Sequence, residues 1–176
     1  MVSNRTAGIL GGAILLGLMA HIEYRLTRLS DQINEIGNII YTRETIIHTK
    51  KDVECLTKNI YYEAGVENRL GKIAVANVTV NRLKEGRWGN NICRVVYAPK
   101  QFSWTLNRRL PKPDKQLWAE SEQIARQVLS GVRLSGLHNS LYYHADYIKP
   151  PKWADNKHYI AQIGQHKFYR QARQAV

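Results

Sequence analysis

An uncharged run near the N-terminus sets that segment apart from the rest of the chain. Residues 6–20, with the sequence TAGILGGAILLGLMA, carry no charged side chain and directly follow Arg5. At a rise of about 1.5 Å per residue, a helix of this length covers less than the ~30 Å hydrocarbon core of a bilayer. Such a run fits an uncleaved signal anchor, a cleaved signal peptide, or a weak anchor that later leaves the membrane. We expect residues 1–22 to form an N-terminal signal anchor rather than a buried core helix.

A heptad pattern of large aliphatic side chains follows the uncharged run. Its members are spaced by 4, 3, 4, 3 and 4 residues: Ile22, Leu26, Leu29, Ile33, Ile36 and Ile40. Apolar side chains at this spacing form the seam of a coiled coil. We therefore expect residues 23–51 to form a short heptad stalk and a polar linker, with homo-oligomer formation through the stalk as a further hypothesis. The alternative is an amphipathic helix that packs on its own domain.

The remaining residues, 52–176, predict one α+β domain that is mostly helical. Asp52 is a candidate N-cap for its first helix, and Gly65 allows a break before Glu67. Residues 70–83 predict a second helix, although the alternation of alanine and valine also fits a strand. Residues 115–130 predict an amphipathic helix. The strands of a small C-terminal antiparallel sheet are predicted in residues 140–148 and 159–170.

The chain is strongly basic, with 26 Lys and Arg residues against 14 Asp and Glu residues and a formal net charge of +12. Such a charge suggests a polyanionic partner: nucleic acid, an anionic membrane surface or a cell-wall polymer. The sequence has no zinc-finger spacing, no RNP-type aromatic motif and no long Lys/Arg block, so we do not expect nucleic acid. We also expect no metal and no cofactor, because the histidine spacings match no HExxH-type motif. The histidines concerned are His138, His144, His158 and His166.

Two glutamates in the stretch NIYYEAGVE, residues 59–67, are the candidates for acid–base chemistry. An acid that protonates a leaving oxygen needs a raised pKa, which burial beside apolar or aromatic groups supplies. Glu63 follows Tyr61 and Tyr62 directly, so it fits a partly desolvated site. Glu67 could orient Glu63, raise its pKa by repulsion, or hold a water molecule. The alternative is a solvated helix face, which is the commoner setting of two glutamates four residues apart.

Further motifs follow this stretch in a fixed order along the predicted domain. They are GKIAVANVTVNR, NICRVVY, QFSW, LYYHADYIKPPKW and IGQHKFY. Together with NIYYEAGVE they resemble the spore-cortex-lytic cell-wall hydrolase family over roughly residues 53–170. The resemblance implies a lysozyme-like, largely helical domain that cuts the glycan strands of peptidoglycan. The N-terminal segment lies outside the resemblance and better suits a Gram-negative or phage lysis protein, such as a membrane-held endolysin.

The resemblance also implies roles for individual side chains. It aligns Glu63 with the catalytic acid of the family, with Glu67 in support. Tyr61 and Tyr62 would shape the pocket of the acid. A further group falls on motifs that would line the cleft, the last two as additional candidates: Gln101, Phe102, Ser103, Tyr143, His144, Trp153 and His166. Tryptophan and tyrosine side chains in such a cleft suit stacking on sugar rings, although part of them will fill the core.

The two cysteines, Cys55 and Cys93, leave two interpretations about equally open from the residues alone. They are either buried small hydrophobic side chains or one disulfide formed in an oxidising compartment. Many members of the resembled family outside the spore formers carry cysteines at similar positions, so the resemblance implies a Cys55–Cys93 disulfide. With the N-terminal segment, it implies an enzyme anchored to the inner membrane whose catalytic domain lies in the periplasm or on the cell-wall side.

Two mechanisms of glycan cleavage remain open from the sequence. In a muramidase-type hydrolase a second carboxylate or a water molecule attacks the anomeric carbon, whereas in a lytic transglycosylase the muramic acid C6 hydroxyl attacks and one glutamate suffices. No aspartate is near Glu63 in the sequence, although Asp146 and Asp155 could approach it in the fold, so we favour the single-glutamate mechanism. The alternatives are a membrane-anchored wall-binding protein without activity and a zinc-dependent amidase.

Overall fold

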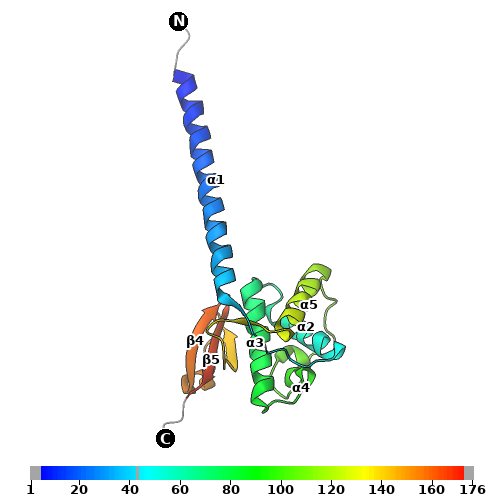
Figure 1. The fold of residues 1–176 in the computed structure, drawn as a ribbon. Helices are drawn as coiled ribbons and strands as arrows, with labels where there is room; N and C mark the ends of the chain where they lie inside the picture. Colours follow the sequence, from blue (N-terminus) through cyan, green and yellow to red (C-terminus); the bar gives the residue numbers. More distant parts are fainter. Residues whose placement is uncertain (1–4, 43, 173–176) are drawn as a thin grey trace. The chain divides into compact units, whose positions relative to one another are not determined.

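The computed structural model describes the backbone of residues 5–42 and 44–172, and the side chains of residues 15–33, 37–42 and 44–172 (Figure 1). The chain divides into two compact units, with the boundary between Asn38 and Ile39. The first unit is formed by the helix α1 (Arg5–Asn38), and the second contains both helices and antiparallel strands. The second unit therefore has the predicted α+β class.

The helix α1 runs without interruption through the predicted anchor and most of the predicted stalk. Four members of the heptad have side chains that are 53–60% exposed: Ile22, Leu26, Leu29 and Ile33. The side chain of Ile36 and residues 1–4 lie outside the described part of the chain. Among the described residues, no helix combines the length and the apolar character that crossing a membrane requires. The uncharged run of residues 6–20 is short and rich in glycine and alanine.

Within the described residues, the second unit contains a small number of helices, two helical turns of the 3-10 type and two sheets. In chain order these elements are β1 (Ile39–Tyr41), α2 (Lys50–Ala64), α3 (Arg69–Glu85), α4 (Ile92–Val96), η1 (Ser103–Leu106), α5 (Lys115–Leu129), β2 (Val132–Leu134), β3 (Tyr142–Ala145), η2 (Lys152–Asn156), β4 (Lys157–Ile163) and β5 (His166–Gln171). The predicted helices near residues 53–64, 70–83 and 115–130 are confirmed, as is the sheet near the C-terminus.

The helix α3 explains why its own sequence pattern was ambiguous. Its apolar side chains are 0% exposed on successive positions around the helix: Ile73, Ala74, Val75, Ala76, Val78 and Val80. A helix buried on all sides lacks the polar face that produces a 3.6-residue period. The strand alternative for residues 70–83 is therefore wrong, and its apparent alternation reflects complete burial.

The helix α2 begins earlier than the sequence suggested. Thr49 is its N-cap: the Thr49 hydroxyl accepts a hydrogen bond from the Asp52 N–H at 3.2 Å, and Asp52 Oδ2 accepts one from the Thr49 N–H at 3.0 Å. This reciprocal arrangement is a capping box. The prediction that Asp52 is the N-cap is therefore wrong, and Asp52 instead occupies position N3 of the helix. A capping box satisfies two backbone N–H groups at once, which is why the helix starts one turn upstream.

The other end of α2 separates the two glutamates of the motif. The helix ends at Ala64, and a Cβ atom added to Gly65 would overlap the carbonyl oxygen of Tyr61. Glu63 consequently lies in the last turn of α2, and Glu67 lies in the turn that leads into α3. The break expected at Gly65 is confirmed, and the two carboxylates do not share one helix.

The strands form two antiparallel sheets, β1 with β2 and a second sheet in the order β3–β5–β4. In the second sheet Tyr143 pairs with Phe168, and His166 pairs with Ala145 on one side and with Ile163 on the other. Figure 1 shows α3 between the β4–β5 hairpin on one side and the helices α2 and α5 on the other. The hydrophobic core extends from these three helices to Phe168 of β5. This packing brings the end of α2 close to the sheet.

Residues 39–42 and 44–46, which the sequence suggested as stalk and linker, lie against the domain as a strap. Besides the pairing of β1 with β2, the Thr42 N–H donates to the Gly131 carbonyl oxygen at 2.9 Å. The Ile46 N–H donates to the Leu129 carbonyl oxygen at the same distance, 2.9 Å. The strap therefore forms part of the compact unit that begins at Ile39.

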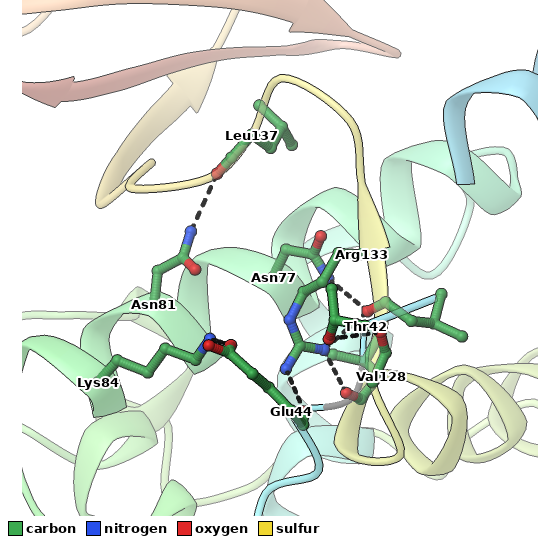
Figure 2. A network of polar contacts seen from close by, with 10 residues as sticks. Thr42, Glu44, Asn77, Asn81, Lys84, Val128, Arg133 and Leu137 are labelled. Atoms are coloured by element: carbon green, nitrogen blue, oxygen red, sulfur yellow. Dashed lines mark hydrogen bonds and ion pairs between the residues drawn. The ribbon is translucent and has the colours of Figure 1, made fainter. Parts of the chain in front are cut away.

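Polar side chains hold the strap in place, as Figure 2 shows. Lys84 of α3 forms an ion pair with the carboxylate of Glu44, and Arg133 of β2 donates to the Glu44 carbonyl oxygen at 3.4 Å. Arg133 also donates to the carbonyl oxygens of Val128 at 2.5 Å and Val132 at 2.8 Å. A buried guanidinium that is shared among carbonyl oxygens fixes the strap to the end of α5.

Candidate active site

A cleft with a volume of about 640 Å³ opens where the end of α2 meets the sheet. Its lining residues come from separate parts of the domain: Tyr62, Glu63, Arg82, Lys100, Gln101, Phe102, Ser103, Leu106, Tyr143, His144, Ala145, Tyr147, Ile148, Pro151, Trp153 and His166. Most of the site residues suggested by the sequence are thus gathered around one cavity. The two that do not line it are Tyr61 and Glu67.

Glu63 lies at the base of this cleft, in the last turn of α2. Burial is the largest influence on its carboxyl group and raises its pKa above the ordinary value for glutamate. A hydrogen bond from Tyr143 and the charge of Arg82 act in the opposite direction without cancelling the effect of burial. A carboxyl group with a raised pKa keeps its proton closer to neutral pH, which is the state that a general acid needs.

Tyr143 of β3 donates its phenolic hydrogen to Glu63 Oε2 at 3.0 Å. Burial raises the pKa of Tyr143 well above its ordinary value, and the neighbouring Glu63 adds to this rise. The phenol therefore remains a donor throughout the physiological range. This bond occupies Oε2 and leaves Oε1 without a hydrogen bond from Tyr143.

Arg82 is a cleft residue whose role the sequence alone did not reveal. It is only 6% exposed, its Nε donates to the Leu141 carbonyl oxygen at 2.8 Å, and its Nη1 is buried with no hydrogen bond to the described residues. The guanidinium group lies 5.5 Å from the ring centre of Trp88 and 5.3 Å from that of Phe102. A buried cation between two aromatic rings beside Glu63 favours the carboxylate form of that residue. The sequence feature that could have indicated this role is the position of Arg82 near the end of the long apolar run of α3.

The loop from Gln101 to Ser103 forms one wall of the cleft. Phe102 is 3% exposed and lies against Arg82, whereas the Gln101 side chain donates to the Pro99 carbonyl oxygen at 3.2 Å. Ser103 is exposed and opens the turn η1. The loop therefore presents polar groups to the cleft above an aromatic base.

The two tyrosines before Glu63 have different surroundings. Tyr62 lines the cleft and stacks on Trp104, with ring centres 5.0 Å apart. Tyr61 points elsewhere: its hydroxyl accepts a hydrogen bond from the Asp114 N–H at 2.9 Å, and its ring lies 5.7 Å from that of Trp118. Tyr61 thus connects α2 to the start of α5, and its expected contact with the pocket is not seen.

His144 and Trp153 form another part of the cleft wall, and both contact the ring of Tyr169, which does not belong to the lining. His144 is 5% exposed, with Nδ1 at 2.8 Å from the Ala145 carbonyl oxygen and Nε2 at 3.0 Å from the Tyr169 hydroxyl. Both ring nitrogens thus have partners within the protein. Trp153 packs edge-on against His144 at 5.8 Å between ring centres and against Tyr169 at 5.6 Å. This wall is consequently an aromatic surface held by hydrogen bonds behind it.

Glu67 lies behind the cleft, against the β4–β5 hairpin. Its Oε1 accepts a hydrogen bond from the Gln165 N–H at 3.0 Å and lies 3.4 Å from His166 Nδ1. Among the described residues, no hydrogen bond joins Glu67 to Glu63. Within the lining of the cleft, Glu63 is the one carboxylate, because neither Asp146 nor Asp155 belongs to that set.

The described residues contain no cluster of three or more His, Cys, Asp or Glu side chains that could bind a metal ion. Of the histidines considered for a zinc site, His138 and His158 are exposed and do not line the cleft. The structure therefore offers no support for the amidase alternative.

The two cysteines are joined. The Cys55–Cys93 disulfide has an S–S distance of 2.14 Å and a sequence separation of 38. It connects α2, which bears Glu63, to α4, which precedes the Gln101 loop. The disulfide implied by the sequence resemblance is present.

Comparison with known proteins identifies the class of this fold. A model of the cell wall hydrolase family matches residues 66–169, a range that begins after Glu63. The spore cortex-lytic enzyme of Oceanobacillus iheyensis is 29% identical over 125 residues, which are 69% of this chain and 42% of the relative. The corresponding enzyme of Bacillus subtilis is 26% identical over 122 residues, or 68% of this chain and 38% of the relative. This chain therefore spans less than half the length of these relatives.

Solved structures agree with the family match. The catalytic domain of the germination-specific lytic transglycosylase SleB from Bacillus anthracis superimposes with a TM-score of 0.58 at 24% identity and covers 70% of this chain and 97% of that domain. The catalytic domain of the Bacillus cereus SleB protein gives a TM-score of 0.60 at 22% identity, with 73% and 97% coverage. At these identities the comparison establishes the fold, which is mostly helical with a small antiparallel sheet.

Proposed function

The chain belongs to the cell wall hydrolase family, and on this premise we propose that it cleaves the glycan strands of peptidoglycan, with Glu63 as general acid and then general base. The observation that carries the proposal is the position of Glu63: it is the one carboxyl group in the described lining of an aromatic cleft, and burial raises its pKa. The names of the relatives, spore cortex-lytic enzyme and lytic transglycosylase, support a cell-wall substrate.

In the first step of the proposed reaction, Glu63 gives the proton on Oε1 to the glycosidic oxygen. The bond between that oxygen and the anomeric carbon of muramic acid breaks, and the leaving sugar departs as an alcohol. Glu63 becomes a carboxylate close to the positive charge that develops on the sugar. The hydrogen bond from Tyr143 and the charge of Arg82 stabilise this carboxylate.

In the second step, the C6 hydroxyl of the same muramic acid attacks its anomeric carbon. The hydroxyl proton goes to Glu63, so the acid is regenerated and the strand ends in a 1,6-anhydro ring. A single carboxyl group suffices for this sequence of steps. We therefore favour a lytic transglycosylase over a muramidase-type hydrolase, in which a second carboxylate would activate water or attack.

The test compares the full chain, as wild type and as Glu63→Gln, on purified peptidoglycan, with mass spectrometry of the fragments. Glu54→Gln is the matched control, because Glu54 lies on the same helix with a side chain that is 55% exposed. We expect 1,6-anhydro-muramic ends from the wild type and the control, and a rate lower by about 10²–10⁴-fold in Glu63→Gln. Fragments with reducing ends would indicate that the enzyme is a hydrolase and not a transglycosylase. Uncut strands with free peptides, or equal activity in Glu63→Gln, would overturn the proposal.

The proposed place of action is the cell-wall side of the inner membrane, in the periplasm of a Gram-negative host. The Cys55–Cys93 disulfide supports an oxidising compartment, and the net charge of +12 suits the anionic wall. Cell fractionation combined with thiol alkylation tests this. We expect the oxidised form in the periplasmic or membrane fraction, and free thiols in a cytoplasmic fraction would contradict it.

The N-terminal helix is proposed to hold the enzyme at the inner membrane and to pair with a second copy. The uncharged residues 6–20 support the first role, and the exposed aliphatic seam that includes Leu26 and Leu29 supports the second. Sedimentation of the full chain tests the pairing, with Leu26→Ser/Leu29→Ser as the variant and Gln32→Ser as the control. We expect the double variant alone to be monomeric, and a monomeric wild type would exclude pairing.

A further inference from the structure

The second glutamate of the motif lies outside the cleft, yet the side chain of Glu67 is only 8% exposed. A buried carboxylate is costly unless polar groups compensate for the lost water. Its partners are the Gln165 N–H, at 3.0 Å from Oε1, and His166 Nδ1, at 3.4 Å from the same atom. Gln165 precedes β5 and His166 begins it, so the carboxylate connects the α2–α3 turn to the β4–β5 hairpin.

Two glycines leave the space that this carboxylate occupies. A Cβ atom on Gly71, in the first turn of α3, would lie 2.9 Å from Glu67 Cβ. A Cβ atom on Gly164 would overlap Glu67 Oε2, and the φ angle of Gly164 is +56°, a value that favours glycine. The backbone on both sides therefore fits a carboxylate in this position.

His166 transmits the position of Glu67 to the cleft. The imidazole lines the cleft, while its Nδ1 is buried, has no hydrogen bond in the described structure and lies at ion-pair distance from Glu67. The ring packs edge-on against Tyr143, with centres 5.2 Å apart and planes at 88°. Tyr143 in turn donates to Glu63. A continuous series of contacts thus runs from Glu67 through His166 and Tyr143 to the proposed acid.

We propose that Glu67 is a positioning residue that acts through His166. The carboxylate keeps the proton of the neutral imidazole on Nδ1, which leaves Nε2 as a hydrogen-bond acceptor on the cleft wall. Nε2 then accepts a hydrogen bond from a hydroxyl group of the glycan strand. The identity of this ligand rests on the proposed function, whereas the Glu67–His166 pair is independent of it.

The charges around His166 are consistent with a neutral ring. Burial lowers the pKa of His166, and the nearby His144 lowers it further, whereas Glu67 and Asp146 raise it. The net direction is downward, so the imidazole is uncharged at neutral pH. Tyr143, whose ring packs at a right angle to the imidazole, stays protonated because burial raises its pKa well above the ordinary value. A neutral imidazole has one donor and one acceptor, and the carboxylate decides which nitrogen is the donor.

The first test is NMR titration of His166 in the full chain, with His166→Gln used to assign its signal. In Glu67→Gln the side-chain oxygen can still accept from the Gln165 N–H, but the charge that raises the pKa of His166 is gone. We expect the titration midpoint to move to lower pH in Glu67→Gln and to stay unchanged in Glu54→Gln. The ¹⁵N shifts of the wild type should show the tautomer protonated on Nδ1. A midpoint that does not move in Glu67→Gln would overturn the proposal. The opposite tautomer in the wild type would also overturn it, and this measurement remains possible even if Glu67→Gln fails to fold.

The second test asks whether Glu67 acts through His166 during cleavage. We expect Glu67→Gln to lower kcat/KM for peptidoglycan by about tenfold or more, as expected for loss of a partner that orients a histidine. The double variant Glu67→Gln/His166→Gln should be no worse than His166→Gln alone, and Glu67→Asp should recover part of the loss. Additive losses would overturn the proposal. A wild type that does not cleave peptidoglycan would refute the proposed function, while the titration would still decide on the pair.

Discussion

The phenolic hydroxyl of Tyr143 in β3 donates a hydrogen bond of 3.0 Å to Oε2 of Glu63 in the last turn of α2. This bond joins the small sheet to the helical part of the domain at the proposed acid. Burial raises the pKa of Glu63, and this bond lowers it, so the two effects together set the pH range in which the acid is protonated.

Replacing Tyr143 with phenylalanine removes the donor and keeps the ring. The pKa of Glu63 should rise further, because the charged form loses a hydrogen bond, and the basic limb of the pH–rate profile should move to higher pH. The rate should fall by about tenfold or more, since a hydrogen bond to a charged group contributes ~1.5–3 kcal/mol. Tyr142→Phe is the control, because its hydroxyl donates to Gln171 on the same sheet. Identical pH profiles for the two variants would contradict this role.

Removing the charge of Arg82 should act in the same direction. Arg82 lowers the pKa of Glu63, so Arg82→Gln should move the basic limb of the profile to higher pH, whereas Arg82→Lys should move it less. Arg82→Gln will also lose the contacts of the guanidinium group with the rings of Trp88 and Phe102. Arg87→Gln, an exposed arginine on the same Trp88 ring, controls for charge alone. A profile in Arg82→Gln that keeps its wild-type midpoint would show that the guanidinium is purely structural.

Glu63→Gln should stabilise the fold at neutral pH. The folded chain holds the Glu63 proton more tightly than the unfolded chain, because burial raises the folded pKa. The wild type therefore loses stability as pH rises through the folded pKa, and this loss is absent below the unfolded pKa. Urea unfolding at several pH values should give a gain for Glu63→Gln at neutral pH that vanishes in acid. A gain of the same size at every pH would mean that the effect does not come from ionisation.

Loss of the disulfide should destabilise the domain strongly. With a sequence separation of 38, the chain-entropy estimate for closing this loop is about 3–4 kcal/mol. The free energy of unfolding of Cys55→Ala/Cys93→Ala should therefore be lower by that amount, so the variant should unfold at a lower urea concentration. A reductant should lower the stability of the wild type but not that of the variant. A reductant that leaves the wild type unchanged would show that the bridge is absent in solution.

Local features of the sequence were sufficient to predict much of the domain. The helices over residues 53–64 and 115–130, the break at Gly65 and the C-terminal strands follow from caps, periodicity and turn residues. The resemblance to a known family, and not local pattern, singled out Glu63 as the proposed acid and the Gln101 and Tyr143 segments as lining its cleft. The predictions of the helices, the strands and the break at Gly65 succeed because each depends on side chains a few residues apart.

Other features depend on contacts between distant segments. Glu63 and Glu67 are four residues apart in the sequence, but Glu67 lies against a hairpin about a hundred residues later in the chain. Arg82 ends an apolar run, and only the packing of α3 against Leu141, Trp88 and Phe102 makes it a buried cation in the cleft. The strap of residues 39–42 and 44–46 is likewise held by partners in α3, α5 and β2.

The sequence by itself determined the basic charge, the main helices and the C-terminal strands, because these depend on local pattern and composition. The choice of Glu63 as the proposed acid came from the resemblance to a known family. The resemblance to a known family, rather than spacing, indicated that Cys55 pairs with Cys93. Only the tertiary structure decided the surroundings of the carboxylates. Burial, hydrogen bonds and charge from β3, α3 and β5 give Glu63 a raised pKa and direct Glu67 toward His166. A pKa is a property of the folded environment, and that environment is assembled from segments that the sequence keeps far apart.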